Sequence, residues 1–177
     1  MTVKMQSFVC MLLFILSMIL ICATAKPAAA GTSLRAFETD SLEKIQVAYA
    51  GRPFLLVLWS LDCPPCRKEL DLLGKIKKRH PDLHLVLIST DPAELSGQIS
   101  SVLVKYRLAI TDAWVFSQTS AERLRYMIDP AWYGEMPRSY FYDPQHNRVG
   151  VSGALNAQQI ETWLTSFRIA PPRKTGG

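Results

Sequence analysis

The stretch 59-WSLDCPPCRKEL-70 places two cysteines three positions apart, with two prolines between them. A close cysteine pair can be a structural staple, part of a metal site or a redox centre. The run before it, 53-PFLLVLWS-60, is continuously apolar, which is typical of a strand buried on both faces. From Pro64 to His80 apolar residues recur at helical spacing. We therefore expect the cysteines where a buried strand gives way to a helix.

The rest of the chain continues this alternation. Short apolar runs predict further strands over residues 83–90, 113–117, 138–143 and 147–153. Apolar residues at helical spacing, with capping residues before them, predict helices over residues 40–51, 91–106, 119–128 and 156–167. Two adjacent strands and a helix close the chain. This order predicts an α/β fold, with a central mixed sheet flanked by helices.

The first 25 residues have the layout of a secretory signal. Lys4 precedes an 18-residue apolar run, Phe8 to Ala25, which ends in small residues suited to a cleavage site. A run of this length also reaches the lower limit for a membrane-spanning helix, so an uncleaved inner-membrane anchor stays open. We expect an exported, periplasmic protein with a signal peptide or anchor over 1–25, a folded domain over 26–168 and a flexible tail over 169–177.

Composition narrows the function further. Of four cysteines, Cys10 and Cys22 lie in the apolar run, so the exported chain keeps Cys63 and Cys66. One close pair does not make a disulfide-stapled scaffold, and closing so small a ring contributes only about 2 kcal/mol. The formal net charge of +5 becomes +4 without Lys4 and forms no dense basic cluster, so nucleic acid is not an expected partner.

The cysteine pair could also belong to a zinc site. The spacing of Cys63, Cys66, His80 and His84 is that of a zinc finger. In such a finger both histidines lie on one helix, whereas Pro81 directly follows His80 and His84 falls in a predicted strand. The surroundings therefore argue against a zinc site.

A redox role gives each residue of the pair a function. At the start of a helix, Cys63 would face unpaired amide groups and the positive end of the helix dipole. Both favour the thiolate, which is the attacking species in disulfide exchange. Cys66, one turn later, is placed to resolve a mixed disulfide. Pro64 and Pro65 fit the first helical turn and stiffen the link.

At these positions the sequence resembles the thioredoxin-fold proteins, and more closely the exported TlpA/ResA-like branch. The motif consists of Trp59, Cys63, Pro64, Pro65, Cys66, Arg67, Lys68 and Glu69. A second segment, 134-GEMPRSYFYD-143, resembles the part of that family that holds a cis-proline, here Pro137. The resemblance implies a thioredoxin fold with an inserted, helix-containing segment before the cis-proline strand.

The resemblance also implies roles for individual residues. Cys63 would be the nucleophile and Cys66 the resolving thiol of a redox-active disulfide. Met136 and Pro137 would pack beside the sulfurs, and Met136 would offer backbone hydrogen bonds to a substrate chain. Glu69 matches an acid that tunes cysteine acidity in ResA-like members. The alternative for Glu69 is an exposed carboxylate in the first turns of a helix.

Two positions depart from the family pattern. The buried acid that thioredoxins carry on the strand before the motif falls at Val57, so its proton-transfer role is vacant or passes to Glu69. Asp62 replaces the usual aromatic residue before the first cysteine. Its charge should oppose the thiolate of Cys63, while the two basic residues after the pair favour it.

Three aromatic residues are candidates to line a groove for an extended substrate: Trp59, Trp132 and Tyr133. For Trp59, packing in the core is the alternative. The sequence thus predicts a periplasmic thiol:disulfide oxidoreductase that needs no cofactor or metal. From the resemblance, we expect it to reduce protein disulfides, for example in cytochrome c maturation, with electrons from a membrane thiol donor.

Two other classes of function stay open. A copper or zinc chaperone would hold its metal on Cys63 and Cys66, with Met136 as a possible thioether ligand, because soft metals prefer sulfur. A redox-inactive interaction module of the same fold would not need either thiol.

Overall fold

The computed structural model describes residues 34–109 and 111–168. The expected signal peptide or anchor over 1–25 and the expected tail over 169–177 lie outside this range. Within the described part, none of the helices combines the length and the apolar character needed to cross a membrane.

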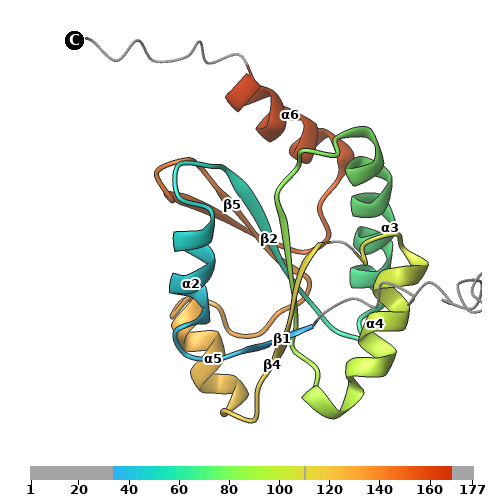
Figure 1. Cartoon of the computed structure of the whole chain (residues 1–177), viewed down its shortest axis with the longest axis vertical. Coiled ribbons are helices and arrows are strands. Elements are labelled where there is room, and N and C mark those ends of the chain that lie inside the picture. The colour runs from blue at the N-terminus through green and yellow to red at the C-terminus, as the bar shows by residue number, and fades with distance from the viewer. Residues whose placement is uncertain (1–33, 110, 169–177) are drawn as a thin grey trace, which may run out of the picture. The chain divides into compact units, whose positions relative to one another are not determined.

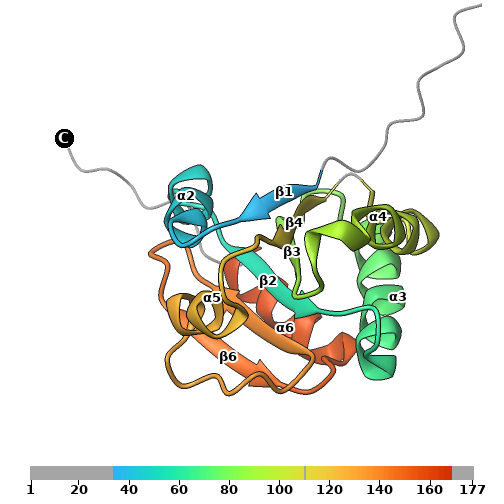
Figure 2. The same cartoon turned by 90° about the horizontal axis from the view of Figure 1, so that it is seen from below.

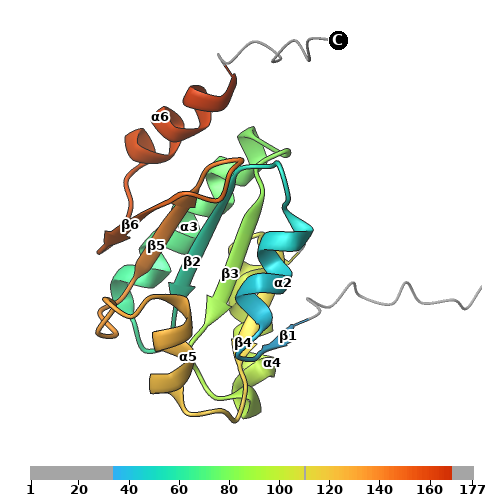
Figure 3. The ribbon, with the colours of Figure 1, turned by 90° about the vertical axis from the view of Figure 1, so that its left-hand side faces the viewer.

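The centre of the fold is a six-stranded mixed sheet with the order β1-β4-β3-β2-β5-β6. The strands are β1 (Arg35–Phe37), β2 (Phe54–Trp59), β3 (Leu85–Ser89), β4 (Asp112–Phe116), β5 (Arg138–Tyr142) and β6 (Arg148–Ser152). Neighbours among β1, β4, β3 and β2 are parallel, whereas β5 is antiparallel to both β2 and β6. Figure 3 shows β6, β5, β2 and β3 side by side.

Helices cover both faces of this sheet. They are α2 (Ser41–Ala48), α3 (Pro64–Arg79), α4 (Ser96–Lys105), α5 (Ala121–Ile128) and α6 (Ala157–Arg168), with a 3₁₀ turn η1 (Ala93–Leu95) before α4. The sheet lies between α3 and α4 on one side and α2 and α5 on the other (Figure 1), and α6 packs on the α3 side. This three-layer arrangement confirms the predicted α/β class.

Burial on both faces explains why the sequence of β2 is continuously apolar. Alternate side chains of a strand point to opposite faces. Leu55, Val57 and Trp59 join the core under α3, α4 and α6. Phe54, Leu56 and Leu58 join the core under α2 and α5. All six are at most 1% exposed, so both faces of the strand select apolar residues.

Four local features differ from the sequence-based expectation or add to it. Strand β1 was not predicted, because it has only three residues and only Phe37 is buried. The helix expected over 91–106 begins as η1, and α4 starts at Ser96. Asp91, the first residue of that predicted helix, accepts a hydrogen bond from the backbone N–H of Leu61. His84 lies one residue before β3 rather than within the strand.

The topology brings distant segments together at one end of the sheet. The chain leaves the carboxyl end of β2 and turns directly into α3, with α5 on the opposite side of the sheet (Figure 2). Because β5 runs antiparallel to β2, its amino end lies at this same edge. Strand β4 and helix α5 precede β5 in the chain and form the expected inserted segment. The α3 amino end and the β5 amino end therefore share one site.

Candidate functional site

The two cysteines form a disulfide at the amino end of α3. Cys63 is the residue before the helix and has an extended backbone, with φ of −115° and ψ of 95°. Its Sγ is bonded to the Sγ of Cys66, and the two Cα atoms are 5.2 Å apart. The same Cys63 Sγ accepts a hydrogen bond of 3.2 Å from the backbone N–H of Cys66. The sulfur therefore faces the free amide groups of the helix start, as the sequence predicted.

The two cysteine residues differ in accessibility. Cys63 is 8% exposed and Cys66 is 1% exposed. The residues around them are exposed and comprise Asp62, Pro64, Pro65, Arg67 and Lys68. A substrate sulfur can therefore approach Cys63 more readily than Cys66.

The loop before Cys63 is clamped at Leu61. Asp91 accepts a hydrogen bond of 2.9 Å from the Leu61 N–H and one of 2.6 Å from the hydroxyl of Ser89. On the other side of the peptide, Arg67 donates to the Leu61 carbonyl oxygen from Nη2 at 2.6 Å and from Nε at 3.1 Å. Asp91 is buried. Both polar groups of Leu61 are thus held by charged side chains, which fixes the approach to the first cysteine.

The peptide bond between Met136 and Pro137 is cis, as the resemblance implied. Pro137 is buried, and Met136 is half-buried and packs against the core cluster that contains both cysteines. The Pro137 carbonyl oxygen accepts a hydrogen bond of 2.9 Å from the N–H of Gly153. The cis-proline segment and the disulfide therefore lie at the same edge of the sheet, although more than 70 residues separate the two in the sequence.

Glu69 is buried at 1% exposure, so the alternative of an exposed helical carboxylate is wrong. The hydroxyl of Ser139 donates a hydrogen bond of 2.9 Å to its Oε1, and Oε2 has no partner that meets hydrogen-bond geometry. Burial raises the pKa of Glu69 to about 7, against the opposing effect of the Ser139 hydrogen bond. Glu69 follows Cys66 by three residues, which places both on one face of α3.

Ser139 connects Glu69 to the position where thioredoxins carry a buried acid. Ser139 on β5 pairs directly with Val57 on β2. The carboxyl group of Glu69 thus contacts the sheet where Ser139 of β5 and Val57 of β2 are paired. Glu69 on α3 thus places a carboxyl group near position 57 of β2, where the acid of thioredoxins is missing.

The three aromatic residues proposed for a groove have different environments. Trp59 is 1% exposed and belongs to the core, which is the alternative given for it above. Trp132 is 4% exposed, and its Nε1–H donates a hydrogen bond of 2.9 Å to the carbonyl oxygen of Glu135. Tyr133 is 92% exposed. Of the three side chains, only that of Tyr133 is available to a substrate.

The histidines of the zinc-finger spacing lie far from the cysteines. His80 follows α3, whose 16 residues span about 24 Å, and its Nε2 lies 2.9 Å from Glu161 Oε2. His84 stacks obliquely on Tyr49, with ring centroids 5.3 Å apart. Within residues 34–109 and 111–168, no three His, Cys, Asp or Glu side chains gather as a metal site would require.

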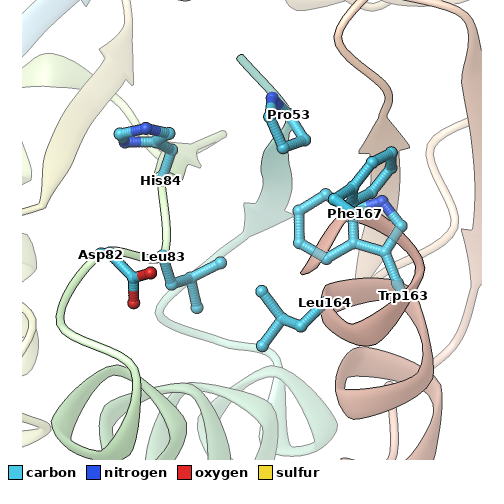
Figure 4. A pocket seen from close by; sticks show the side chains of 7 residues that line it. All are labelled: Pro53, Asp82, Leu83, His84, Trp163, Leu164 and Phe167. Atoms are coloured by element: carbon cyan, nitrogen blue, oxygen red, sulfur yellow. The ribbon is translucent and has the colours of Figure 1, made fainter. Parts of the chain in front are cut away.

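One apolar pocket of about 310 Å³ lies at the other end of the sheet. Trp163, Leu164 and Phe167 of α6 line one side of it, and Pro53 and Leu83 lie across from them (Figure 4). Pro53 precedes β2 and Leu83 precedes β3, whereas the cysteines follow the carboxyl end of β2. This pocket is therefore separate from the disulfide.

These elements define a thioredoxin fold with a CxxC disulfide at the amino end of its first long helix and a cis-proline at the same edge of the sheet. The sequence matches no protein-family model and no curated protein.

Solved structures with the same fold include several bacterial proteins. A secreted disulfide oxidoreductase of Mycobacterium tuberculosis, described as homologous to E. coli DsbE, has 20% identity and a TM-score of 0.54, covering 68% of this chain and 85% of its own. A thioredoxin-family thiol:disulfide interchange protein of Chlorobium tepidum has 13% identity and a TM-score of 0.55, covering 68% and 83%. A DsbF homologue of Corynebacterium diphtheriae has 23% identity and a TM-score of 0.51, covering 68% and 75%. At these identities the similarity establishes the fold.

Proposed function

We propose that this protein is a thiol:disulfide oxidoreductase that acts on polypeptide substrates. The observation that carries the proposal is that the Cys63–Cys66 disulfide and the cis Met136–Pro137 bond lie at the same edge of the sheet. A disulfide at a helix amino end is poised for exchange, because that position stabilises the thiolate of the reduced form. The solved structures that share the fold are described as disulfide oxidoreductases or interchange proteins, which supports the same activity.

In the reducing direction, the Cys63 thiolate attacks one sulfur of a substrate disulfide. A bond forms between that sulfur and Cys63, the substrate S–S bond breaks, and one substrate thiolate leaves. The Cys66 thiolate then attacks the Cys63 sulfur and releases the second substrate thiolate. Two electrons pass from the dithiol to the substrate, and the protein retains the Cys63–Cys66 disulfide. The greater exposure of Cys63 supports its role as the attacking residue.

Glu69 is the proposed proton carrier for Cys66. The resolving thiol must lose its proton before it attacks, and a general base works best when its pKa is near the ambient pH. Burial raises the pKa of Glu69 to about 7, which meets this condition. Glu69 also lies on the same face of α3 as Cys66. In this proposal Glu69 assumes the role that the acid on the β2 strand has in thioredoxins.

Site-shaping roles are proposed for five further residues. Pro137 and Met136 would position the substrate chain, with the Met136 backbone as its hydrogen-bonding partner. Pro64 and Pro65 would keep the two thiols at a fixed separation. Trp59 is buried behind the disulfide and would support it through packing.

The physiological setting is part of the proposal. We infer export to the periplasm, through the apolar amino-terminal segment as a signal peptide or inner-membrane anchor. In that oxidising compartment, reduction of protein disulfides, including those of cytochrome c maturation, requires a membrane thiol donor. The described secretion of the Mycobacterium tuberculosis protein that shares the fold is compatible with this location.

A trapping experiment tests the activity and names the substrates. The full chain carrying Cys66→Ala is expressed in cells, quenched with acid and alkylated, and mixed disulfides on Cys63 are isolated. We expect covalent complexes with polypeptides that disappear under reducing conditions and in the Cys63→Ser/Cys66→Ala control. Absence of such complexes would count against disulfide exchange.

The metal-chaperone alternative is tested on the reduced protein. Copper(I) or zinc is titrated into the full chain, and the reduction of a test disulfide is measured in parallel. Turnover with weak metal binding supports the oxidoreductase. Tight stoichiometric binding without turnover would support the chaperone. A redox-inactive module would be indicated if Cys63→Ser left cellular function intact.

A further inference from the structure

The loop that carries the cis-proline begins at Asp129, which directly follows α5. Asp129 is 9% exposed and binds groups from three segments. Its Oδ2 accepts a hydrogen bond of 2.8 Å from the Tyr140 hydroxyl and one of 3.1 Å from Arg138 Nη2. Its Oδ1 accepts one of 3.1 Å from the Ala131 N–H and lies 3.4 Å from Arg148 Nη2. A single carboxylate thus joins the loop to β5 and β6.

The two arginines bound by Asp129 also enclose an aromatic ring. The guanidinium carbons of Arg138 and Arg148 are each 4.9 Å from the ring centroid of Tyr140. Arg148 donates a further hydrogen bond to the carbonyl oxygen of Ile128, at the end of α5. Hydrogen bonds and two cation–π contacts therefore act on the same four side chains, which restricts their movement.

Gly150 gives this cluster the room it needs. Gly150 on β6 pairs with Tyr140 on β5. A Cβ atom at Gly150 would lie 2.6 Å from Arg138 Nη2 and 3.1 Å from the Tyr140 ring. The absence of a side chain at this position therefore lets Arg138 lie across the sheet towards Asp129.

A second set of contacts holds the far end of the same loop. Arg138 Nη1 donates a hydrogen bond of 2.7 Å to the Ser152 hydroxyl, which in turn donates one of 2.7 Å to Glu135. Arg138 also lies 3.7 Å from the Glu135 carboxylate. The residue next to Glu135 is Met136, which begins the cis peptide. The loop is thus fixed at both ends by Arg138, and the adjacent Pro137 cannot move independently of this cluster.

We propose that Asp129 is a positioning residue for polypeptide substrates: it holds Met136 and Pro137 in place beside the disulfide. This inference rests on the proposed oxidoreductase function. A misplaced binding segment slows reaction with substrates that must align on it, because productive geometry tolerates little displacement. A small disulfide does not extend over the loop and reacts at Cys63 alone. Asp129 therefore governs exchange with polypeptides without changing the chemistry of the sulfurs.

The test uses the reduced full chain and two disulfides, insulin and hydroxyethyl disulfide. In Asp129→Asn the charge that pairs with both arginines is lost, and in Tyr140→Phe one hydrogen bond to Asp129 is lost while the ring stays. Asp143→Asn is the control, because Asp143 binds only its own turn, with hydrogen bonds from Gln145 and Asn147 of 2.8 Å each. Thermal unfolding confirms that each variant is folded.

We expect Asp129→Asn to lower the rate constant for insulin at least about tenfold. For Tyr140→Phe we expect about threefold, as for the loss of one hydrogen bond. The rate with hydroxyethyl disulfide and the reduction potential should not change in either variant, and Asp143→Asn should match the wild type. Equal losses on both disulfides, or no loss on insulin in either variant, would overturn the proposal. A wild-type protein that reduces neither disulfide would instead refute the oxidoreductase function itself.

Discussion

Glu69 on α3 and Ser139 on β5 share a buried hydrogen bond of 2.9 Å that joins the helix of the cysteine pair to the strand that follows the cis-proline. Ser139 faces Val57 across the sheet, at the position where thioredoxins carry a buried acid. The carboxyl group of Glu69 therefore reaches the same region from α3 instead of from β2. Burial there raises the pKa of Glu69 to about 7, so this carboxyl group ionises near neutral pH.

The first prediction concerns the pH dependence of stability. Because the pKa of Glu69 is raised from 4.5 to about 7, the folded state holds its proton more tightly than the unfolded chain. Its stabilising contribution is fully present below pH 4.5, falls as the pH rises towards 7 and is absent above that. The change amounts to about 3 kcal/mol at most. Glu69→Gln should therefore be more stable than the oxidised wild type at pH 8 and similar to it at pH 5.

Urea unfolding of both oxidised proteins at the two pH values measures this difference. Glu161→Gln serves as the control, because hydrogen bonding from Arg79 lowers the pKa of this partly exposed carboxyl group. It should give no gain in stability at pH 8. A Glu69→Gln variant whose stability follows the wild type at both pH values would contradict the raised pKa.

The second prediction concerns variants in which the carboxyl group is moved from Glu69 on α3 to position 57 on β2. Glu69→Gln should slow polypeptide disulfide reduction at pH 7 by about 100-fold or more, as expected for the loss of a general base. Adding Val57→Asp to this variant should recover much of the rate, because the new carboxyl group faces the same Ser139. Val57→Asp alone should be destabilised, since two carboxyl groups would then share one buried site.

Steady-state reduction of insulin by the three variants measures the rates, and the reduced wild type sets the reference. If the variant with both Glu69→Gln and Val57→Asp were no faster than Glu69→Gln alone, a carboxyl group beside Ser139 would not account for the proposed role of Glu69.

The third prediction uses two helical glycines with opposite surroundings. A Cβ atom at Gly74 on α3 would overlap the backbone carbonyl oxygen of Tyr106 at the end of α4, whereas one at Gly97 on α4 would meet no atom within 4 Å. Gly74→Ala should therefore destabilise the protein by about 1–3 kcal/mol, although alanine favours helix. Gly97→Ala should be neutral or stabilising by up to about 1 kcal/mol.

Chemical denaturation of the two single variants compares these effects. The pair separates helix propensity from packing, because both changes add one methyl group to a helix. Equal shifts in stability would show that α3 and α4 do not approach each other this closely.

The fourth prediction concerns the clamp on Leu61. Asp91→Ala removes the acceptor for the Leu61 N–H and the Ser89 hydroxyl, so it should cost about 2–3 kcal/mol of stability. Asp71→Ala is the matched control, because Asp71 is exposed and pairs with Lys75 one turn along α3. Such a pair contributes at most about 0.5 kcal/mol.

Equilibrium unfolding of both variants tests the clamp, and the rate of disulfide formation after reduction tests its effect on the cysteines. We expect slower formation in Asp91→Ala only. Similar stabilities for the two variants would show that Asp91 does not hold this loop.

The local elements followed from the sequence because their signals are local. The buried strand β2 has an apolar residue at each position, since both of its faces lie in the core. The cysteines and prolines then begin α3 at the predicted residue. Strand β1 gave no such signal, because it has three residues and depends on β4 for its hydrogen bonds. The pattern predicts a helix that starts at Asp91, because its neighbours in sequence could not reveal its contact with the distant Leu61.

Two thiols at a helix start, and a proline segment to accompany them, could be predicted from neighbouring residues alone. The burial of Glu69 beside Ser139, and the contacts of Asp129 with Arg138, Tyr140 and Arg148 around the start of the cis-proline loop, emerged only from the packed fold. Helix periodicity and cysteine spacing are properties of neighbouring residues. Burial and charge pairing depend on which strands meet, and for β2 and β5 that contact joins residues about 80 positions apart.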